Sequence, residues 1–367
     1  MLTTLLISIA VTSLISVFLA LLMVIADATI GNYGVVKISV NNGIRELEVL
    51  GGQPLLRSLQ QEGIFIPSAC GGRGSCGLCK VKVIEGGGDY LPTELPFISE
   101  EERKELVRLS CQVKVKNDVA IEIPEELFYV KEFSTKVERI RDLTHDIKEV
   151  TLRLIEPEQI TIKAGQYVQF VVPEYEDLDE EVYRAYSVAS PPGDASHVEL
   201  EVRLVPGGIC TTYVHEHLKE GDEVMINGPY GEFFLRDTDT PVIFIAGGSG
   251  MAPIKSILLD MEKSQNPRPA QYFFGARSKR DLFLLDEMKA LETSIPNFTF
   301  IPALSEPLEE DNWEGEIGLI TDVVHRNVKD ASLSEAYLCG SPGMIDACIK
   351  VLSDLGVSED CIFYDKF

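Results

Sequence analysis

Four of the eight cysteines constrain the fold of this chain more than any other feature of its sequence. Three share one glycine-rich loop with the spacing Cys70-x5-Cys76-x2-Cys79, and Cys111 follows on a strand expected over residues 109–115. Glycine lets a backbone wrap a buried group closely and direct N–H groups at sulfur. Two disulfides fit so tight a loop poorly, and zinc sites favour paired C-x2-C knuckles. The pattern therefore predicts that these four cysteines ligate a [2Fe–2S] cluster.

The sequence around this loop alternates short strands with one main helix. Residues 35–40 and 44–49 alternate apolar and polar side chains on either side of Asn41-Asn42-Gly43, which is a hairpin signal. A short amphipathic helix is expected over residues 55–62, between Pro54 and Gly63. We therefore expect a compact α+β domain over residues 33–127, with the β-grasp ferredoxin fold.

The chain begins with a long apolar run. Residues 2–26 carry no charge before Asp27, and a helix of this length, at about 1.5 Å per residue, exceeds the roughly 30 Å hydrocarbon core of a bilayer. We expect a single N-terminal transmembrane helix over residues 2–26. A cleaved signal peptide is the alternative, because Ala26-Asp27-Ala28 resembles a cleavage site, although no Lys or Arg precedes Lys37.

The charge of the chain excludes one class of partner. There are 58 Asp and Glu against 33 Lys and Arg, which gives a formal net charge of −25. A protein this acidic is repelled by phosphate backbones. We expect no nucleic-acid partner.

Residues 130–237 carry short alternating strands with almost no helix, a pattern typical of an antiparallel β-barrel. Within it lies Arg184-Ala185-Tyr186-Ser187. Arg184 is suited to neutralise a pyrophosphate, Tyr186 to stack on a flat heterocycle, and Ser187 to bond its edge, which together suit a flavin nucleotide. A glycine-rich turn and helix start follow at residues 206–212, an expected phosphate site.

Residues 239–367 alternate buried strands with helices, as parallel α/β sheets do. The apolar run 242–246 leads into Gly247-Gly248-Ser249-Gly250-Met251-Ala252-Pro253 and a helix expected through Met261. Such glycines let the pyrophosphate of a dinucleotide approach a helix N-terminus. We expect a parallel-sheet domain that binds a nicotinamide dinucleotide, so the whole chain combines α+β and α/β domains.

These motifs together resemble a known family. Arg-x-Tyr-Ser, Gly-x-Gly-x-x-Pro, Cys-Gly-x-Pro and an aromatic C-terminus resemble the ferredoxin–NADP⁺ reductase superfamily over residues 133–367. With the apolar N-terminus and the C-x5-C-x2-C domain ahead of them, the chain resembles the family of F subunits of sodium-translocating NADH:quinone oxidoreductases. Further likenesses are the segments 228–234, 275–280 and 311–313.

The resemblance implies a role for individual residues. It assigns the cluster to Cys70, Cys76, Cys79 and Cys111. It implies that FAD is held by Arg184, Tyr186, Ser187, Gly208, Thr211 and Thr212, with Phe367 near the flavin ring. It implies an NADH site lined by Gly248, Gly250, Pro253, Arg277, Cys339, Gly340 and Asp365, and it places Ser187 and Cys339 beside the reacting groups. We read Cys339 as a contact that positions the nicotinamide and not as a nucleophile.

Electron counting orders the three cofactors. NADH gives up two electrons as a hydride, which a [2Fe–2S] cluster cannot take, whereas a flavin accepts the hydride and releases single electrons. We therefore expect an NADH dehydrogenase that passes electrons from NADH to FAD, to the cluster and on to membrane subunits that reduce a quinone such as ubiquinone. Sodium transport would be the work of those other subunits, because one helix cannot form an ion path.

Three further expectations concern the function, the nucleotide and the location of the protein. One alternative function is an anchored reductase that supplies an oxygenase or a corrinoid-activating protein, and another is an electron carrier with a vestigial flavin domain. Arg277-Ser278-Lys279-Arg280 favours NADPH, whereas Asp281 and the family resemblance favour NADH, which we expect. Because NADH is cytoplasmic, we expect a single-pass protein of the inner (plasma) membrane with its other domains in the cytoplasm.

Overall fold

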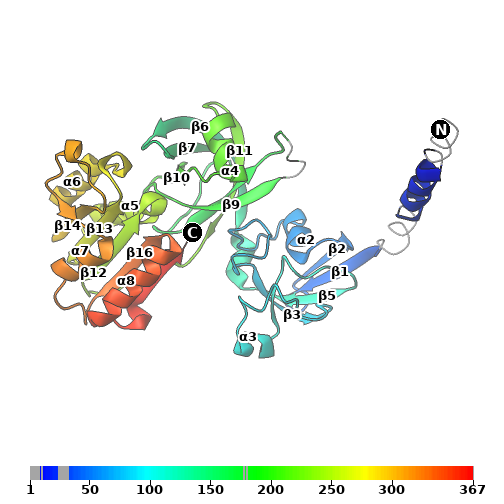
Figure 1. The fold of residues 1–367 in the computed structure, drawn as a ribbon. Helices are drawn as coiled ribbons and strands as arrows, with labels where there is room; N and C mark the ends of the chain where they lie inside the picture. The colour runs from blue at the N-terminus through cyan, green and yellow to red at the C-terminus, as the bar shows by residue number, and fades with distance from the viewer. Residues whose placement is uncertain (1–8, 10, 24–32, 177, 179–180, 367) are drawn as a thin grey trace. The chain divides into compact units, whose positions relative to one another are not determined.

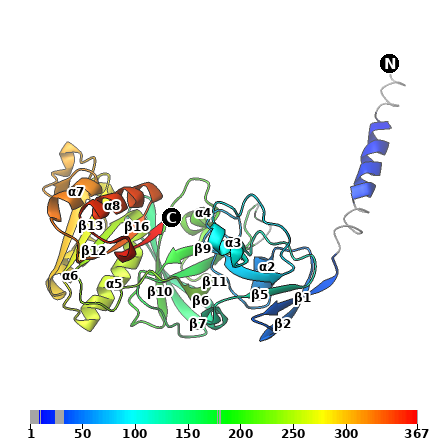
Figure 2. The same cartoon turned by 90° about the horizontal axis from the view of Figure 1, so that it is seen from below.

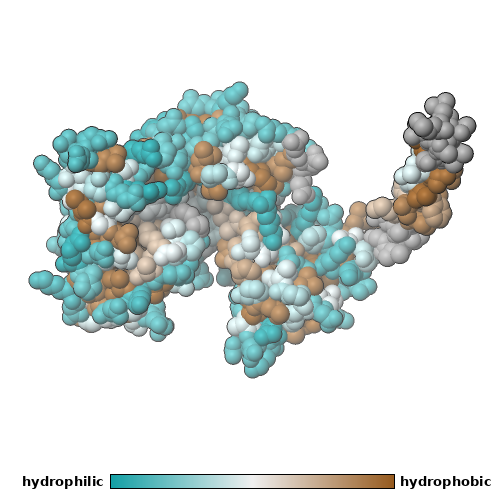
Figure 3. All heavy atoms as spheres, viewed as in Figure 1, coloured by the Kyte–Doolittle hydropathy of each residue, from teal (hydrophilic) through white to brown (hydrophobic). Residues whose placement is uncertain are grey.

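The chain divides between Tyr129 and Val130 into two compact units. The computed structural model describes residues 9, 11–23, 33–176, 178 and 181–366 (Figure 1). Much of the apolar run at residues 2–26 lies outside this set, and its described residues 9 and 11–23 are helical and exposed. Figure 3 shows this helical segment as predominantly hydrophobic. Within the described part of the chain, no helix has the length and apolar character needed to cross a membrane.

The first unit is built on a five-stranded sheet in the order β2-β1-β5-β3-β4. Its strands are β1 (Val35–Val40), β2 (Arg45–Leu50), β3 (Lys80–Glu85), β4 (Val107–Leu109) and β5 (Val119–Glu122), and its helical segments are α2 (Leu55–Gln61), α3 (Glu100–Lys104) and η1 (Glu125–Tyr129). Asn41 and Asn42 take positive φ in the β1–β2 hairpin, as the Asn-Asn-Gly sequence predicts. The apolar face of α2, including Leu55 and Leu59, packs into the core of this sheet.

One expected strand of this unit is much shorter than predicted. Residues 109–115 were expected to carry Cys111 within the sheet, but β4 ends at Leu109. The carbonyl of Leu109 accepts the N–H groups of Gln112 and Val113, which bends the chain into a turn. Cys111 therefore lies on the turn after the strand, and it returns to the cysteine loop from there.

The second unit begins with a six-stranded antiparallel sheet in the order β10-β7-β6-β11-β8-β9. Its strands are β6 (Lys131–Asp142), β7 (Ile147–Glu156), β8 (Tyr167–Val172), β9 (Val182–Ser187), β10 (His197–Arg203) and β11 (Glu223–Tyr230). The sheet curls until its edges meet, where Val188 bridges Leu200 and the Ala189 N–H donates to the Glu199 carbonyl at 2.8 Å. The short α4 (Ile209–Thr212) and one π-helical turn, η2 (Tyr213–His217), cover it.

A six-stranded parallel sheet in the order β15-β14-β13-β12-β16-β17 completes the second unit. Its strands are β12 (Val242–Gly247), β13 (Ala270–Ala276), β14 (Phe298–Leu304), β15 (Glu316–Ile317), β16 (Glu335–Gly340) and β17 (Ile362–Lys366). The helical segments are η3 (Gly248–Gly250), α5 (Met251–Ser264), η4 (Lys279–Asp281), α6 (Leu285–Ser294), η5 (Glu309–Asp311), α7 (Ile320–Asn327), α8 (Pro342–Asp354) and η6 (Glu359–Cys361).

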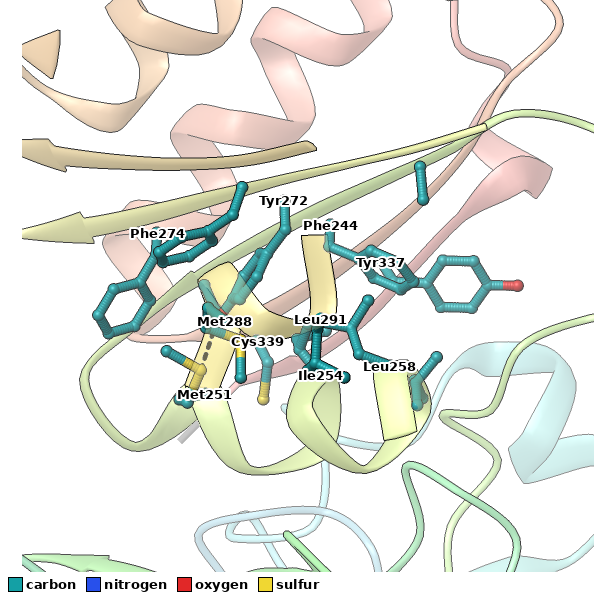
Figure 4. Close-up of a cluster of buried hydrophobic side chains, with 14 of the residues drawn as sticks. Phe244, Met251, Ile254, Leu258, Tyr272, Phe274, Met288, Leu291, Tyr337 and Cys339 are labelled. Atoms are coloured by element: carbon teal, nitrogen blue, oxygen red, sulfur yellow. Dashed lines mark hydrogen bonds between the residues drawn. The ribbon is translucent and has the colours of Figure 1, made fainter. Parts of the chain in front are cut away.

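Helices cover both faces of this parallel sheet (Figure 2). On one face Ile254 and Leu258 of α5 pack with Met288 of α6 against the strands (Figure 4). On the other face Val323 of α7 and Ile345 of α8 form a separate core. Because both faces are covered, β12 is apolar throughout and almost fully buried, as its continuous apolar run predicts. α5 ends at Ser264, one turn beyond the expected Met261.

Candidate functional site

The four predicted cluster cysteines converge in two pairs. The Cys76 thiol hydrogen-bonds Cys70 and lowers its pKa, while the pKa of Cys76 rises. Cys79 and Cys111 form the second pair, in which the pKa of Cys111 is lowered and that of Cys79 is raised by their mutual hydrogen bond. The two pairs also influence each other electrostatically, through Cys70 and Cys111. The fold therefore brings together all four thiols, although Cys111 comes from a distant part of the chain.

This pairing fits a two-iron cluster better than a single ion. A [2Fe–2S] cluster takes four cysteines, two for each iron, whereas a structural zinc ion needs four ligands around one point. All four thiols are unbridged, and the pairs match the ligand set of the cluster.

Glycines let the cysteine loop pack closely against its surroundings. Gly74 and Gly77 have φ of +73° and +72°, a backbone conformation that favours glycine. A side chain at position 77 would come within 2.8 Å of the ring of Phe97, and one at position 74 within 2.6 Å of the Gln112 amide. Ser110 holds the end of the loop in place, because its N–H and its hydroxyl both donate to the Cys79 carbonyl, at 2.8 and 3.0 Å.

A buried ion pair holds the segment that covers this loop. Glu94 is fully buried and accepts two hydrogen bonds from Arg108, at 2.9 and 2.7 Å, and one from the Leu109 N–H. Arg108 also donates to the carbonyls of residues 87–89 and lies 4.4 Å from the centre of the Tyr90 ring. The segment 87–97 is thereby fixed to β4, next to Cys111. Neither Glu94 nor Arg108 was predicted from the sequence.

The structure brings the Arg-x-Tyr-Ser strand next to the glycine-rich turn. The Tyr186 hydroxyl hydrogen-bonds the buried thiol of Cys210 in α4, and burial raises the pKa of both groups. Arg184 is close enough to lower both of these pKa values. Every residue of β9 is partly exposed, so this strand keeps an open face. Ser187 ends the strand opposite Tyr167 of β8.

The predicted phosphate turn is held by one of its own threonines. The Thr211 hydroxyl accepts the Val205 N–H at 3.1 Å and lies 3.2 Å from the Gly208 carbonyl, to which it donates. Gly208 precedes α4, and a side chain there would come within 2.5 Å of that hydroxyl. Thr211 therefore shapes the turn, and Thr212 follows it as the last residue of α4.

Three glycine loops meet at the carboxyl ends of the central parallel strands. Gly247 pairs with Gly275 in register, and Ala246 pairs with Cys339. At Gly250 a Cβ atom would come within 2.2 Å of the Cys339 carbonyl oxygen, so only glycine fits. Pro253 is buried in the first turn of α5. The loops expected to hold NADH therefore lie side by side, at the edge where such sheets bind ligands.

Burial raises the pKa of two titratable groups at this edge. Cys339 is fully buried, and burial raises its pKa well above the ordinary value. It is therefore a thiol and not a thiolate. Asp365 lies beside it on β17, and burial raises its pKa to about 6. Phe367 lies outside the described residues.

The basic run after β13 is engaged with acidic partners. Arg277 pairs with Glu306 at 2.9 Å, and Lys279 donates to the Asp311 carbonyl at 2.8 Å. Asp281 accepts both the N–H and the hydroxyl of Ser278 at 2.9 Å. Its carboxylate thus caps η4.

The charged face of β10 was not predicted from the sequence. Glu201 stands directly opposite Glu149 of β7, and both are buried. Lys255 of α5 reaches Glu149 at 3.4 Å and Glu199 at 3.1 Å. Arg203, next on this face, pairs with Asp146 at 2.8 Å and lies beside Gly248. The signal was the alternation of charged and apolar residues along β10, which places Glu199, Glu201 and Arg203 on one face.

Three family models match consecutive parts of the chain. A 2Fe-2S iron-sulfur cluster binding domain matches residues 38–116, an oxidoreductase FAD-binding domain matches residues 134–235, and an oxidoreductase NAD-binding domain matches residues 244–350. The predicted cofactors, a [2Fe–2S] cluster, FAD and NADH, are confirmed by these matches.

Two solved structures are similar over most of this chain and nearly all of their own length. A cytochrome P450 reductase of Amycolatopsis, GcoB, is 29% identical with a TM-score of 0.73, over 90% of this chain and 98% of that one. The ferredoxin reductase in carbazole 1,9a-dioxygenase is 27% identical with a TM-score of 0.70, over 91% and 98%.

Curated relatives match nearly the whole chain at higher identity. The F subunit of the Na(+)-translocating NADH-quinone reductase of Neisseria meningitidis is 42% identical over 395 residues, which cover 97% of both chains. The protein of the same name from Histophilus somni is 40% identical over 400 residues, which cover 98% of both chains. The alignments are longer than the 367-residue chain, so these relatives carry insertions that this chain lacks. The chain belongs to the family of F subunits of the Na(+)-translocating NADH-quinone reductases.

Proposed function

We propose that this protein is the NADH-oxidising subunit of a sodium-translocating quinone reductase complex. The proposal rests on one observation. The same chain contains a site of four thiols, the glycine loops expected to bind a dinucleotide, and the strand β9 with the residues expected to bind a flavin. Full-length similarity to F subunits of such complexes supports the assignment of the acceptor. Electrons would pass from NADH through FAD and the cluster to other membrane subunits and then to a quinone.

The residues of the second unit would hold and orient the two nucleotides. Arg184 neutralises the FAD pyrophosphate, and Tyr186, fixed by its bond to Cys210, presents its ring to the flavin. Ser187 bonds the flavin edge. The turn shaped by Thr211, with Gly208 and Thr212, receives the remaining phosphate contacts. When bound, FAD converts the hydride of NADH into single electrons that the cluster can accept.

The glycine loops would receive NADH. Gly248 and Gly250 leave room for its pyrophosphate at the start of α5, and Pro253 keeps that first turn rigid. Arg277 contacts the adenosine ribose. Cys339 and Gly340 position the nicotinamide, with Asp365 beside them. Because the Cys339 thiol stays protonated, it takes no part as a nucleophile.

The acidic partners of the basic run favour NADH over NADPH. Glu306 forms an exposed ion pair with Arg277, and the backbone carbonyl of Asp311 accepts a hydrogen bond from the Lys279 ammonium. A 2′-phosphate would have to compete with the Glu306 carboxylate for Arg277 and would be repelled by it, whereas a 2′-hydroxyl can donate to that carboxylate.

Residues 2–26 would anchor the protein in the inner membrane as one helix, with the remaining domains in the cytoplasm where NADH is found. The apolar length of the run supports this proposal. The exposed apolar side chains at residues 11–23 would then face lipid or the other membrane components of the complex.

Replacement of one cluster ligand tests the electron path. In Cys76→Ala, we expect the EPR signal of the reduced [2Fe–2S] cluster to be lost, while NADH still bleaches the flavin, because the two sites lie in separate units. Quinone reduction in membranes that contain the partner subunits should fall to background. An intact EPR signal would refute the ligand assignment, and full quinone reduction without the cluster would refute the path.

A further inference from the structure

A side-chain amide contacts one of the four cluster cysteines. The Gln112 Nε2 lies 3.5 Å from the Cys111 sulfur, a hydrogen-bonding distance for sulfur. At its other end the Gln112 Oε1 accepts a hydrogen bond from the Thr93 hydroxyl at 2.8 Å. The amide therefore bridges the segment 87–97 and the turn that carries Cys111.

The Cys111 sulfur sets the direction of this amide. An amide can be turned so that either its oxygen or its NH₂ group faces a neighbour, and the hydrogen-bond network decides. A thiolate sulfur can only accept, so the NH₂ group faces it, and the Thr93 hydroxyl, which can donate or accept, donates to the amide oxygen. The reversed orientation would place an amide oxygen against a negatively charged thiolate, which is repulsive.

The protein backbone is shaped to accept this amide. Gly74 of the cysteine loop lies directly beneath Gln112, and a Cβ atom there would come within 2.6 Å of Nε2. Thr93 is in turn held next to Glu94, which is fully buried against Arg108. Thr93 and Gln112 thus sit on two segments that are fixed independently, so their contact is not a chance meeting of two mobile side chains.

We propose that Gln112, held in place by Thr93, is a positioning residue that raises the reduction potential of the cluster. Reduction adds one negative charge, and donors to the ligand sulfurs stabilise that charge. The Gln112 amide supplies such a donor to Cys111. This inference rests on the proposed assignment of Cys111 as a cluster ligand.

Redox titration of the full-length holoprotein, followed by the EPR signal of the reduced cluster, tests this role. In Gln112→Leu we expect the equilibrium constant for cluster reduction to fall five- to tenfold, and tenfold corresponds to a potential lower by about 59 mV for one electron. Thr93→Val keeps the shape of the side chain but removes the hydrogen bond that holds the amide in place, and we expect a smaller shift in the same direction. Gln61→Leu, at an exposed glutamine of α2, is the matched control and should leave the potential unchanged.

The outcomes separate this inference from the proposed function. An unchanged potential in Gln112→Leu with a full EPR signal and full iron content would overturn it. If Gln112→Leu fails to assemble a cluster, Thr93→Val decides, because it leaves the turn of Cys111 intact, and a wild-type potential there overturns the inference. If the wild-type protein itself carries no [2Fe–2S] signal, the proposed function fails instead.

Discussion

Gly250 lies where the backbone of a neighbouring strand leaves no room for a side chain. The Cys339 carbonyl oxygen would be 2.2 Å from a Cβ atom at this position. The clash is with backbone atoms of β16, which cannot move aside as a flexible side chain could. The requirement is therefore one of packing, in addition to any contact with a phosphate.

Gly250→Ala should separate the phosphate loop from β16. We expect the rate of flavin reduction by NADH to fall at least tenfold and the melting temperature to drop, with the [2Fe–2S] signal unaffected. Stopped-flow absorbance and thermal unfolding measure the two effects. Gly343→Ala is the control, because that glycine lies in α8 with open space around it and alanine stabilises helices. Equal behaviour of the two variants would contradict the packing argument.

Glu201 is a second residue whose surroundings determine its chemistry. It is 3% exposed, and neither carboxyl oxygen has a hydrogen-bond partner among the described residues. Burial raises its pKa to about 8, an effect that Lys255 opposes and that Glu149, Glu199 and Glu287 reinforce. The pKa of Glu149 is instead lowered, because Lys255 and Arg141 outweigh the effect of its burial. The two facing carboxyls therefore differ in charge at neutral pH.

Glu201→Gln should change how stability depends on pH. Between pH 4.5 and 8 the folded protein keeps the Glu201 proton that the unfolded chain loses, so the wild type loses stability as pH rises, by at most about 1.4 kcal/mol per pH unit. Above pH 8 this loss stops. The variant lacks the titration, so its melting temperature relative to the wild type should increase from pH 5.5 to pH 7.5. Parallel profiles, as expected for the exposed Glu223→Gln control, would refute the assignment.

At the level of elements, the strands and helices that have a regular sequence pattern could be predicted. The period-2 strands, the apolar run of β12 and the helix after the glycine loop were all visible. The turn of Cys111 was not, because Leu109 to Val115 alternates like a strand and only the contacts of the Leu109 carbonyl reveal the bend. Glu94 and Arg108 act through partners distant in sequence, so no local pattern could identify them. The alternation along β10 was visible for Glu201, but its pairing with Glu149 of β7 was not.

The η4 segment makes a testable prediction about the dinucleotide. Because Arg277, just before this segment, is already paired with Glu306, we expect kcat/KM to be at least tenfold higher for NADH than for NADPH, about 1.4 kcal/mol of transition-state binding. Glu306→Gln should narrow the ratio by freeing Arg277. Steady-state reduction of ferricyanide with each nucleotide measures it. A preference for NADPH in the wild type would overturn the assignment.

For the whole molecule, the division at residues 129 and 130 means that each unit keeps its own core. Removal of residues 1–30 touches neither core nor any proposed ligand. We expect the truncated protein to keep its flavin, its cluster and its NADH:ferricyanide activity, and to move from the membrane pellet to the supernatant after ultracentrifugation.

Loss of the flavin on truncation would refute the modular organisation. Continued sedimentation with membranes would show that the anchor lies elsewhere. Protease treatment of intact cells that digests the C-terminal domains would contradict their cytoplasmic location.

The fit between Gly250 and the Cys339 carbonyl also limits how this chain can recombine with its relatives. The two residues lie in different βα repeats, yet there is no room between them for a Cβ atom at position 250. A chimaera whose breakpoint falls between α5 and β16 would combine halves from two parents that never adapted to each other. Breakpoints at residues 129 and 130 leave this contact within one parent, so we expect chimaeras that exchange the iron–sulfur unit to keep the dinucleotide-binding edge intact.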